Sequence, residues 1–306
     1  MTASSDQDHA AAARRLATIE AGGTKFNVGI GNGSGAILSQ AEFETRAPDE
    51  TFAQVRAWLD CEIDRSGPIA AIGIASFGPI DVDRTSVGWA HLGLTPKLAW
   101  RGADMAGWLR GYGVPIALDT DVNGAALGEW RWGAARGTAR ACYLTVGTGI
   151  GGGAVLDGKM LSGRSHPEMG HMYVRRQPGD PFAGACPIHG DCLEGLASGP
   201  AIRARWGTSL SGLPAGHPGQ ALIAEYLAQA CINIAVTLAP EKLILGGGVL
   251  GTTGLLERVR ERFEALANGY LAGFAAKDIV RPEFFPLSGL VGGLAIAEMA
   301  LAQSGR

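Results

Sequence analysis

The chain has 306 residues, and its 26 lysine and arginine residues against 29 aspartate and glutamate residues leave a formal net charge of −3. This balance argues against a general nucleic-acid binder, and the length allows two domains with sizeable cores. No uninterrupted apolar run reaches the ~18 residues that a membrane span needs, and residues 1–15 lack the apolar centre of a signal peptide. We therefore expect a cytoplasmic protein with no membrane partner, in which residues 1–15 form a disordered tail.

Segments with strand and helix patterns then alternate in two similar series. The first series comprises a hairpin at 16–30, helices at 51–64, 103–112 and 123–132, and strands at 69–76 and 114–118. The second comprises strands at 141–146, 154–156, 242–245 and 282–287, and helices at 221–238, 251–268 and 291–303. This alternation predicts an α/β architecture of two lobes with a cleft between them. We expect the N-terminal lobe over 16–120, the C-terminal lobe over 121–289, and a helix at 290–306 that packs back on the first lobe.

Three glycine-rich turns are candidates for binding phosphate. The turn Gly22–Lys25 joins the strands of the hairpin, and its N–H groups, threonine hydroxyl and lysine suit phosphate oxygens, although such turns are common in ordinary hairpins. The loop Gly147–Gly153 repeats this plan and lacks the GxxxxGK[ST] pattern; a flexible loop is its alternative. The turn Gly246–Gly248 precedes a predicted helix, so it suits either a nucleotide or close helix–strand packing. The repetition of the first turn in the second favours phosphate binding.

An acidic segment, DTDVN, follows the predicted strand at 114–118. Phosphoryl transfer to a hydroxyl group needs a carboxylate that accepts the proton, whereas helix capping is another common use of Asp and Asn. Asp119 and Asp121 would point to the same side of an extended chain. Their spacing therefore does not choose between them.

The segment from His166 to Glu194 carries the most specific pattern. Cys186, His189 and Cys192 are spaced three residues apart, with glycine and proline between them. Two thiolates and an imidazole need one more ligand to form a tetrahedral structural zinc site, and His166 and His171 are the candidates. A closed set of four ligands argues against catalytic zinc, and the lack of a CxxC pair argues against redox chemistry.

Two glutamates flank these ligands. A loop fixed by a metal would hold Glu168 and Glu194 rigidly, and carboxylates are good acceptors for sugar hydroxyls. Simple surface charge is the alternative for each.

The chain from residue 19 to residue 298 resembles the ROK family of repressors, open reading frames and sugar kinases, through its ExGH element at 168–171 and the cysteine segment ending at Glu194. The resemblance implies a two-lobed, actin-like ATPase (ribonuclease-H-like) fold. Glucokinases of this family usually carry CxCGxxGC, whereas here His189 is the middle ligand in CPIHGDC. With DTDVN, FGPID, TPK and Glu20 in place of the usual aspartate, the sequence is similar to the bacterial zinc-containing fructokinase branch.

The resemblance implies ATP-dependent phosphorylation of fructose at its 6-hydroxyl, with a glucokinase or a broad mannose/fructose kinase as the alternative. It implies ATP, Mg²⁺ and structural Zn²⁺ as cofactors, and a homodimer without a nucleic-acid partner. Asp121 matches the general base. The matched sugar-contacting residues are Glu168, His171, Glu194, Asn123 and Thr120. The matched ATP-binding residues are Gly22, Gly23, Thr24, Lys25, Gly147, Thr148, Gly149, Pro200, Gly246, Gly247 and Gly248. The matched zinc ligands are His171, Cys186, His189 and Cys192.

Two other functional classes are less well supported by the sequence. Repressors of this family carry a helix-turn-helix before the first strand, and only residues 1–15 precede it here. A catalytically silent sugar sensor would not need Asp121 together with both glycine–threonine turns. We therefore expect an active kinase.

Overall fold

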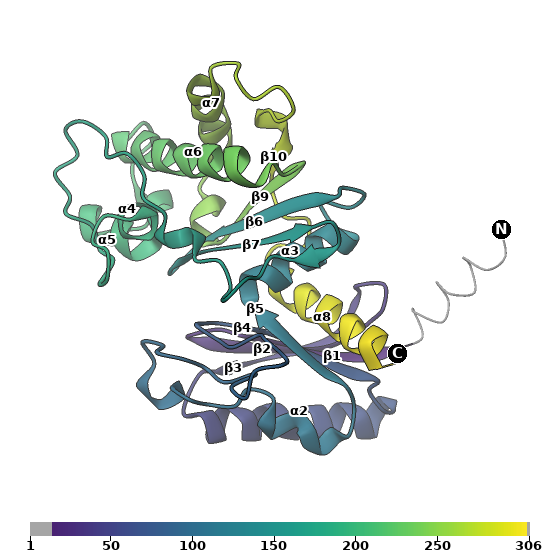
Figure 1. Ribbon diagram of the computed structural model, residues 1–306. Coiled ribbons are helices and arrows are strands. Elements are labelled where there is room, and N and C mark those ends of the chain that lie inside the picture. The colour runs from purple at the N-terminus through teal and green to yellow at the C-terminus, as the bar shows by residue number, and fades with distance from the viewer. Residues whose placement is uncertain (1–13, 305–306) are drawn as a thin grey trace, which may run out of the picture. The chain divides into compact units, whose positions relative to one another are not determined.

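The computed structural model describes residues 14–304, and the chain forms two compact units (Figure 1). Unit 1 runs to Gly133 and also contains Ser162–His166 and the chain from Pro286 onward. Unit 2 contains Ala134–Leu161 and Pro167–Phe285. Each unit is built on a five-stranded sheet.

The sheet of unit 1 combines a parallel part with an antiparallel edge. Its strands are β1 (Arg15–Ala21), β2 (Lys25–Asn32), β3 (Ile37–Glu44), β4 (Ala71–Ser76) and β5 (Ile116–Thr120), in the order β3-β2-β1-β4-β5. β1, β4 and β5 are parallel, whereas β2 pairs antiparallel with β1 and β3. The unit's helices are α2 (Pro48–Ser66), α3 (Asp121–Trp132) and α8 (Ser288–Ser304), with short 3₁₀ helices η1 (Leu98–Trp100) and η2 (Gly107–Tyr112). Figure 1 shows α2 on one face of this sheet and α8 on the other, so β4 is buried along its whole length.

Glycines let helix α8 approach both its strand and its helix neighbour. A Cβ atom on Gly73 of β4 would lie 1.9 Å from the carbonyl oxygen of Gly293, and one on Gly292 would lie 2.2 Å from the carbonyl carbon of Gly124 in α3. A side chain at either position would therefore overlap the neighbouring backbone. This close contact explains why α8 belongs to unit 1 although it is the last helix of the chain.

The sheet of unit 2 has the same mixed plan. Its strands are β6 (Arg140–Val146), β7 (Ile150–Leu156), β8 (Lys159–Met160), β9 (Lys242–Gly246) and β10 (Ile279–Val280), in the order β10-β9-β6-β7-β8. β6 and β9 are parallel, and β6 and β7 form an antiparallel hairpin. The helices are α4 (Leu193–Ala197), α5 (Gly199–Trp206), α6 (Pro218–Leu238) and α7 (Leu255–Ala267), with 3₁₀ helices η3 (Met169–His171), η4 (Leu210–Gly212), η5 (Gly248–Gly251) and η6 (Ala276–Asp278).

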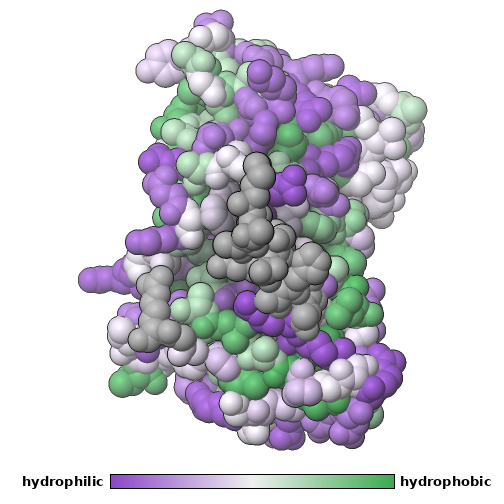
Figure 2. Space-filling view, turned by 90° about the vertical axis from the view of Figure 1, so that its right-hand side faces the viewer, coloured by the Kyte–Doolittle hydropathy of each residue, from purple (hydrophilic) through white to green (hydrophobic). Residues whose placement is uncertain are grey.

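By length and composition alone, helix α6 is long and apolar enough to cross a membrane, with a mean hydropathy of 1.6. From the sequence we had expected no such segment. More than half of the apolar window is buried inside the structure, and Tyr226, Leu227 and Cys231 belong to the core of unit 2. A buried core helix of this kind passes the same test. On the face shown in Figure 2, hydrophilic and hydrophobic residues are intermixed in small groups among the described residues.

Several predicted elements differ from those in the structure. Residues 282–287 form no strand; the strand is Ile279–Val280, and the prolines at 282 and 286 lack the N–H groups that a ladder needs. Strand β3 was missed because it is an edge strand with polar residues on its exposed face. The boundary predicted at residue 120 falls instead at Gly133, since α3 packs on α8. Of the predicted tail, residues 1–13 lie outside the described residues, and β1 begins at Arg15.

Candidate functional site

The parallel strands of unit 1 end in register, and the predicted residues of this unit follow them directly. Ala21 of β1 pairs with Ser76 of β4, and Ser76 pairs with Thr120 of β5. Because the carboxyl ends of parallel strands meet at one edge of the sheet, the turn after β1 and the start of α3 after β5 lie at the same edge. This edge is the candidate site of unit 1.

The structure gives the two aspartates of DTDVN different environments. Asp119 is the penultimate residue of β5 and is buried, whereas Asp121 is the first residue of α3 and is half-buried. Thr120 caps the helix, because its side chain accepts from the N–H of Asn123 at 3.2 Å. The segment is therefore a strand-to-helix turn rather than the extended chain expected, and Asp121 lies at the N-terminus of a helix, where a negative charge is favoured.

Asp119 organises this turn. Its Oδ1 accepts hydrogen bonds from the N–H of Thr120 at 2.7 Å and from Nδ2 of Asn123 at 2.8 Å. Burial raises the pKa of the Asp119 carboxyl above its ordinary value, while these hydrogen bonds and the nearby His166 act in the opposite direction. Asn123 is fully buried, so its amide lies against Asp119. These contacts hold the residues that flank Asp121.

The turn Gly22–Lys25 is tight and lies beside a second lysine. The N–H of Gly22 donates to the carbonyl of Lys25 at 2.9 Å, and a Cβ on Gly23 would lie 3.7 Å from Cε of Lys97. Lys25 itself pairs with Glu42 at the surface. The exposed Thr24 and the half-buried Lys97 therefore join the glycines as candidates at this turn. The sequence singled out the TPK motif but did not connect it with the turn.

Glu20, which precedes this turn, does not extend freely into the site. Its Oε2 accepts from Nδ2 of Asn27 at 2.8 Å, and a Cβ on Gly289 would lie 2.2 Å from its carboxyl carbon. Burial raises the pKa of the Glu20 carboxyl, against the hydrogen bond from Asn27 and the charge of Lys25. The longer side chain is thus accommodated beside the first turn of α8, where glycine leaves room.

In unit 2, the second glycine loop and the third glycine turn line one cavity of about 310 Å³. Gly147, Thr148 and Gly248, which the family resemblance assigns to ATP binding, contribute to its wall. The sequence gave no signal for the other lining residues, which come from α5, η4, η5 and the residues next to them: Gly199, Ile202, Arg203, Ser209, Leu210, Ser211, Val249 and Thr252. The lining includes the hydroxyl side chains of Thr148, Ser209, Ser211 and Thr252 and the arginine Arg203, which suit a phosphorylated ligand.

The remaining predicted nucleotide residues support the cavity without lining it. A Cβ on Gly246 would lie 2.1 Å from the hydroxyl of Tyr143, and Gly247 has a φ of +90° with its Cα packed on Val146. These two glycines serve the close packing of β9 on β6, which was the alternative interpretation for this turn. Pro200 lies in the first turn of α5, where its missing N–H costs nothing.

Gly149 belongs to this supporting group as well. A Cβ on it would lie 2.9 Å from Oε2 of Glu194, and the same oxygen accepts from the N–H of Ile150 at 2.9 Å. Glu194 therefore holds the glycine loop in addition to any contact with a sugar.

The four candidate metal ligands converge in unit 2. The ligand atoms of His171, Cys186, His189 and Cys192 all lie within 4.8 Å of one another. Nδ1 of His171 is 3.8 Å from the sulfur of Cys186 and 3.5 Å from that of Cys192. A tetrahedron with Zn–S of ~2.3 Å and Zn–N of ~2.0 Å has sulfur–nitrogen edges of about 3.5 Å, so the donor set and its spacing fit zinc.

His166, the other candidate for the fourth ligand, lies elsewhere. It belongs to unit 1, where its Nε2 accepts weakly from the N–H of Ile80 at 3.4 Å. The fourth member of the cluster is therefore His171. Because Nδ1 of His171 faces the two sulfurs, Nε2 is the ring nitrogen that remains for a sugar hydroxyl.

Short hydrogen-bonded turns build the metal segment. The N–H of Cys186 donates to the carbonyl of Gly190 at 3.1 Å, and the N–H of Gly190 returns to the carbonyl of Cys186 at 3.0 Å. Cys192 then occupies the N-cap position of α4, whose first turn carries Glu194. On the other side, exposed Glu168 opens η3, and a Cβ on Gly170 would lie 1.7 Å from the carbonyl oxygen of Ile150. Only glycine lets η3 reach this strand, so the packing places Glu168 and His171.

Comparison with known proteins agrees with these features. A model of the ROK family matches residues 16–300. The chain therefore belongs to the ROK family, and the two-lobed actin-like, ribonuclease-H-like fold predicted for it is confirmed.

Two fructokinase relatives match nearly the whole chain. It is 42% identical to a putative fructokinase of Bacillus subtilis over 94% of this chain and 96% of that protein. It is 40% identical to a fructokinase of Pediococcus pentosaceus over 94% and 98%. Among solved structures, a ROK hexokinase from Thermus thermophilus superposes with a TM-score of 0.75 at 27% identity, covering 94% of this chain and 99% of that one. The resemblance seen in the motifs thus extends along the chain.

The raised pKa of the Asp119 carboxyl predicts a pH-dependent contribution to stability. A carboxyl group whose pKa is higher in the folded than in the unfolded state stabilises the fold through its bound proton. This stabilisation is fully present below the unfolded pKa, near 3.8, and is lost as the pH rises through the pKa of the folded state. Asp119→Asn removes it. We therefore expect the free energy of unfolding of the variant, minus that of the parent, to increase as the pH rises from about 4 to 7.

Urea unfolding at a series of pH values measures this difference. Asp64→Asn, at an exposed position of α2, is the control and should show no trend. A difference that stays constant or decreases with pH would show that Asp119 is not destabilised by burial.

Proposed function

We propose that the protein transfers the γ-phosphoryl group of ATP to the 6-hydroxyl of fructose, giving fructose 6-phosphate and ADP. The observation that carries this proposal is Asp121, a half-buried carboxylate at the start of α3, on the sheet edge that also bears the Gly22–Lys25 turn. The fructokinases that are 40–42% identical over most of the chain support fructose as the acceptor. A glucokinase or a broad mannose/fructose kinase is the alternative.

In this reaction Asp121 acts as the general base. Its carboxylate takes the proton of the 6-hydroxyl as that oxygen bonds to the γ-phosphorus, and the bond from phosphorus to the β,γ-bridging oxygen breaks as ADP leaves. Thr120 and Asn123 hold the turn, so Asp121 has little freedom to move. A positioned base of this kind contributes roughly 10²–10⁴ in rate.

Sugar recognition is assigned to Glu168, His171 and Glu194 of unit 2, with Thr120 and Asn123 of unit 1. Carboxylates and an imidazole N–H pair well with sugar hydroxyls. Glu194 also accepts a hydrogen bond from Ile150, next to the glycine loop. We therefore expect it to influence sugar and nucleotide binding together.

ATP is assigned to the cavity of unit 2 lined by Gly147, Thr148 and Gly248, and the Gly22–Lys25 turn of unit 1 remains a candidate for phosphate contacts. Mg²⁺ bound with the nucleotide would neutralise charge on the phosphoryl group. Zn²⁺ would be held by His171, Cys186, His189 and Cys192 and would have a structural role, because four protein ligands leave no open position. A homodimer remains the prediction from family resemblance, and a cytoplasmic location remains the prediction from the sequence.

The substrate is tested by assaying fructose, mannose, glucose and N-acetylated hexoses with ATP and Mg²⁺. With fructose as substrate, a signal from glucose-6-phosphate dehydrogenase that requires added phosphoglucose isomerase reports fructose 6-phosphate, and ADP release is measured in parallel for every sugar. We expect kcat/KM to be at least ~10-fold higher for fructose than for the other sugars, as one or two pocket contacts suffice for such a preference. A preference for glucose supports the alternative, and no turnover with any hexose rules out both.

Replacing the base tests the mechanism. Asp121→Asn keeps the size of the side chain but cannot take a proton, so we expect kcat to fall by about 10²–10⁴ with little change in the thermal unfolding midpoint. Asp64→Asn serves as the charge-matched control and should retain full activity. A near-normal kcat for Asp121→Asn would show that another group is the base.

The metal assignment is tested by elemental analysis of protein purified without added zinc. We expect about one zinc per chain, lost in Cys192→Ser and His189→Ala. The controls are Cys61→Ser, at an exposed free cysteine, and His166→Ala, outside the cluster; both should retain the metal. Active parent protein with less than half an equivalent of zinc would contradict the assignment.

A further inference from the structure

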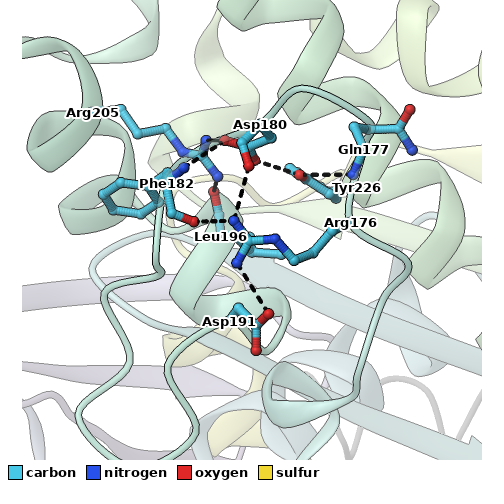
Figure 3. A network of polar contacts seen from close by, with 8 residues as sticks. All are labelled: Arg176, Gln177, Asp180, Phe182, Asp191, Leu196, Arg205 and Tyr226. Atoms are coloured by element: carbon cyan, nitrogen blue, oxygen red, sulfur yellow. Dashed lines mark hydrogen bonds and ion pairs between the residues drawn. The ribbon is translucent and has the colours of Figure 1, made fainter.

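A buried ion pair in unit 2 joins Asp180, in the segment between the candidate metal ligands His171 and Cys186, to Arg205 (Figure 3). The side chains of Asp180 and Arg205 are 2% and 5% exposed. Oδ1 of Asp180 faces Nη1 of Arg205 and also accepts from the N–H of Phe182 at 3.1 Å. Oδ2 accepts from the hydroxyl of Tyr226 in α6 at 2.5 Å. The proposed reaction gives this pair no role, so another reason is needed for charges buried here.

Arg205 connects this segment with two helices. It lies on α5, and its Nη2 donates to the carbonyl of Leu196 in α4 at 3.3 Å. Its guanidinium lies 4.3 Å from the centre of the Phe182 ring, a cation–π contact. Although burial acts to raise it, the hydrogen bonds from Arg205 and Tyr226 hold the pKa of the Asp180 carboxyl below its ordinary value. The pair is therefore charged at neutral pH and fixes α5 to the segment.

The same segment is joined to the turn that carries the metal ligands. Nη1 of Arg176 donates to Oδ2 of Asp191 at 3.1 Å, and its Nη2 donates to the carbonyls of Asp180 and Phe182. Asp191 directly precedes the ligand Cys192. Figure 3 shows Arg176 between Asp191 and the loop around Asp180. The position of the metal ligands is thus linked to the Asp180–Arg205 pair.

The opposite end of this network reaches the candidate nucleotide cavity. Ile202 and Arg203 of α5 line that cavity, and the N–H of Gly199, at the start of α5, donates to the carbonyl of Gly147 at 2.8 Å. A shift of α5 would therefore move the cavity wall and the glycine loop together. Metal ligands, ion pair and nucleotide cavity form one contiguous set of packed groups.

We propose that Asp180 and Arg205 are positioning residues for the nucleotide: they hold α5 against the metal-binding segment, so that metal occupancy and nucleotide affinity are coupled. This inference rests on the proposed nucleotide and zinc sites. Coupling of this kind is reciprocal, because a metal that strengthens nucleotide binding must itself be bound more strongly when nucleotide is present. Typical coupling factors lie between about 5 and 150.

The coupling is measured first in the full-length parent protein. Calorimetry gives the ADP dissociation constant with zinc bound and after zinc is removed by a chelator, and circular dichroism checks that both forms are folded. Competition with a chromogenic chelator gives the zinc affinity with and without saturating ADP. We expect ADP to raise the affinity for zinc, and zinc to raise the affinity for ADP, by the same factor of at least about 5.

The ion pair is then tested with Asp180→Asn, which keeps an acceptor for Phe182 but removes the charge opposite Arg205. We expect this variant to bind zinc and ADP but to have a coupling factor at least threefold lower than the parent (on the order of the smaller couplings known). Asp157→Asn is the matched control, since it removes the charge from an exposed pair with Arg140 in the same unit; its factor should be unchanged. If Asp180→Asn does not fold, Tyr226→Phe, which removes one hydrogen bond from Asp180, takes its place with the same expectation.

A general loss of stability would lower the affinities for ADP and for zinc without changing the coupling factor. The coupling factor therefore distinguishes a positioning role of Asp180 from a general contribution to stability. The inference is overturned if the parent binds ADP equally with and without zinc, or if the folded variant keeps the parent's factor. A parent that binds no ADP or no zinc would contradict the proposed function itself, and this inference with it.

Discussion

The candidate sites depend on the register in which parallel strands end. In unit 1, Ala21, Ser76 and Thr120 are aligned across three parallel strands, so the residues that follow them share one edge. In unit 2, Thr145 of β6 is aligned with Gly246 of β9, which brings the second and third glycine turns to one cavity. A shift of one residue would turn each following side chain to the other face. The sites therefore follow from the pairing of the sheets.

Close backbone contacts maintain this register, and glycine is the residue that permits them. Gly247 lies against Val146 with a left-handed φ of +90°, and Gly170 lies against the carbonyl of Ile150. In both places an added side chain would overlap backbone atoms, and backbone atoms cannot move aside as a flexible side chain can. Much of the glycine in the sequence thus serves packing around a ligand site as well as direct contact with a ligand.

The two aspartates after β5 illustrate how neighbouring residues acquire different roles. Asp119 is buried, and its carboxyl group accepts hydrogen bonds from Thr120 and Asn123. Asp121 lies two residues further along the chain, is the first residue of helix α3, and is half-buried. Unit 2 uses a comparable division, in which Asp180 and Arg205 hold the elements that carry the ligands without being ligands themselves. In both units, buried polar or charged side chains hold neighbouring residues in position. The more accessible side chains, such as Asp121, are the ones to which we assign the chemistry.

The sequence by itself determined the α/β class, the family, and the residue types of the metal cluster, because motif spacing and strand–helix alternation are local properties. It did not separate His166 from His171, which are five residues apart in one segment; the structure puts the first in unit 1 and the second beside Cys186 and Cys192. It also missed Arg203, Thr252 and the Asp180–Arg205 pair. These residues come together only when α5 packs against the segment around Asp180 and against the residues that follow β9, and no short-range pattern records a contact between residues that lie far apart in the chain.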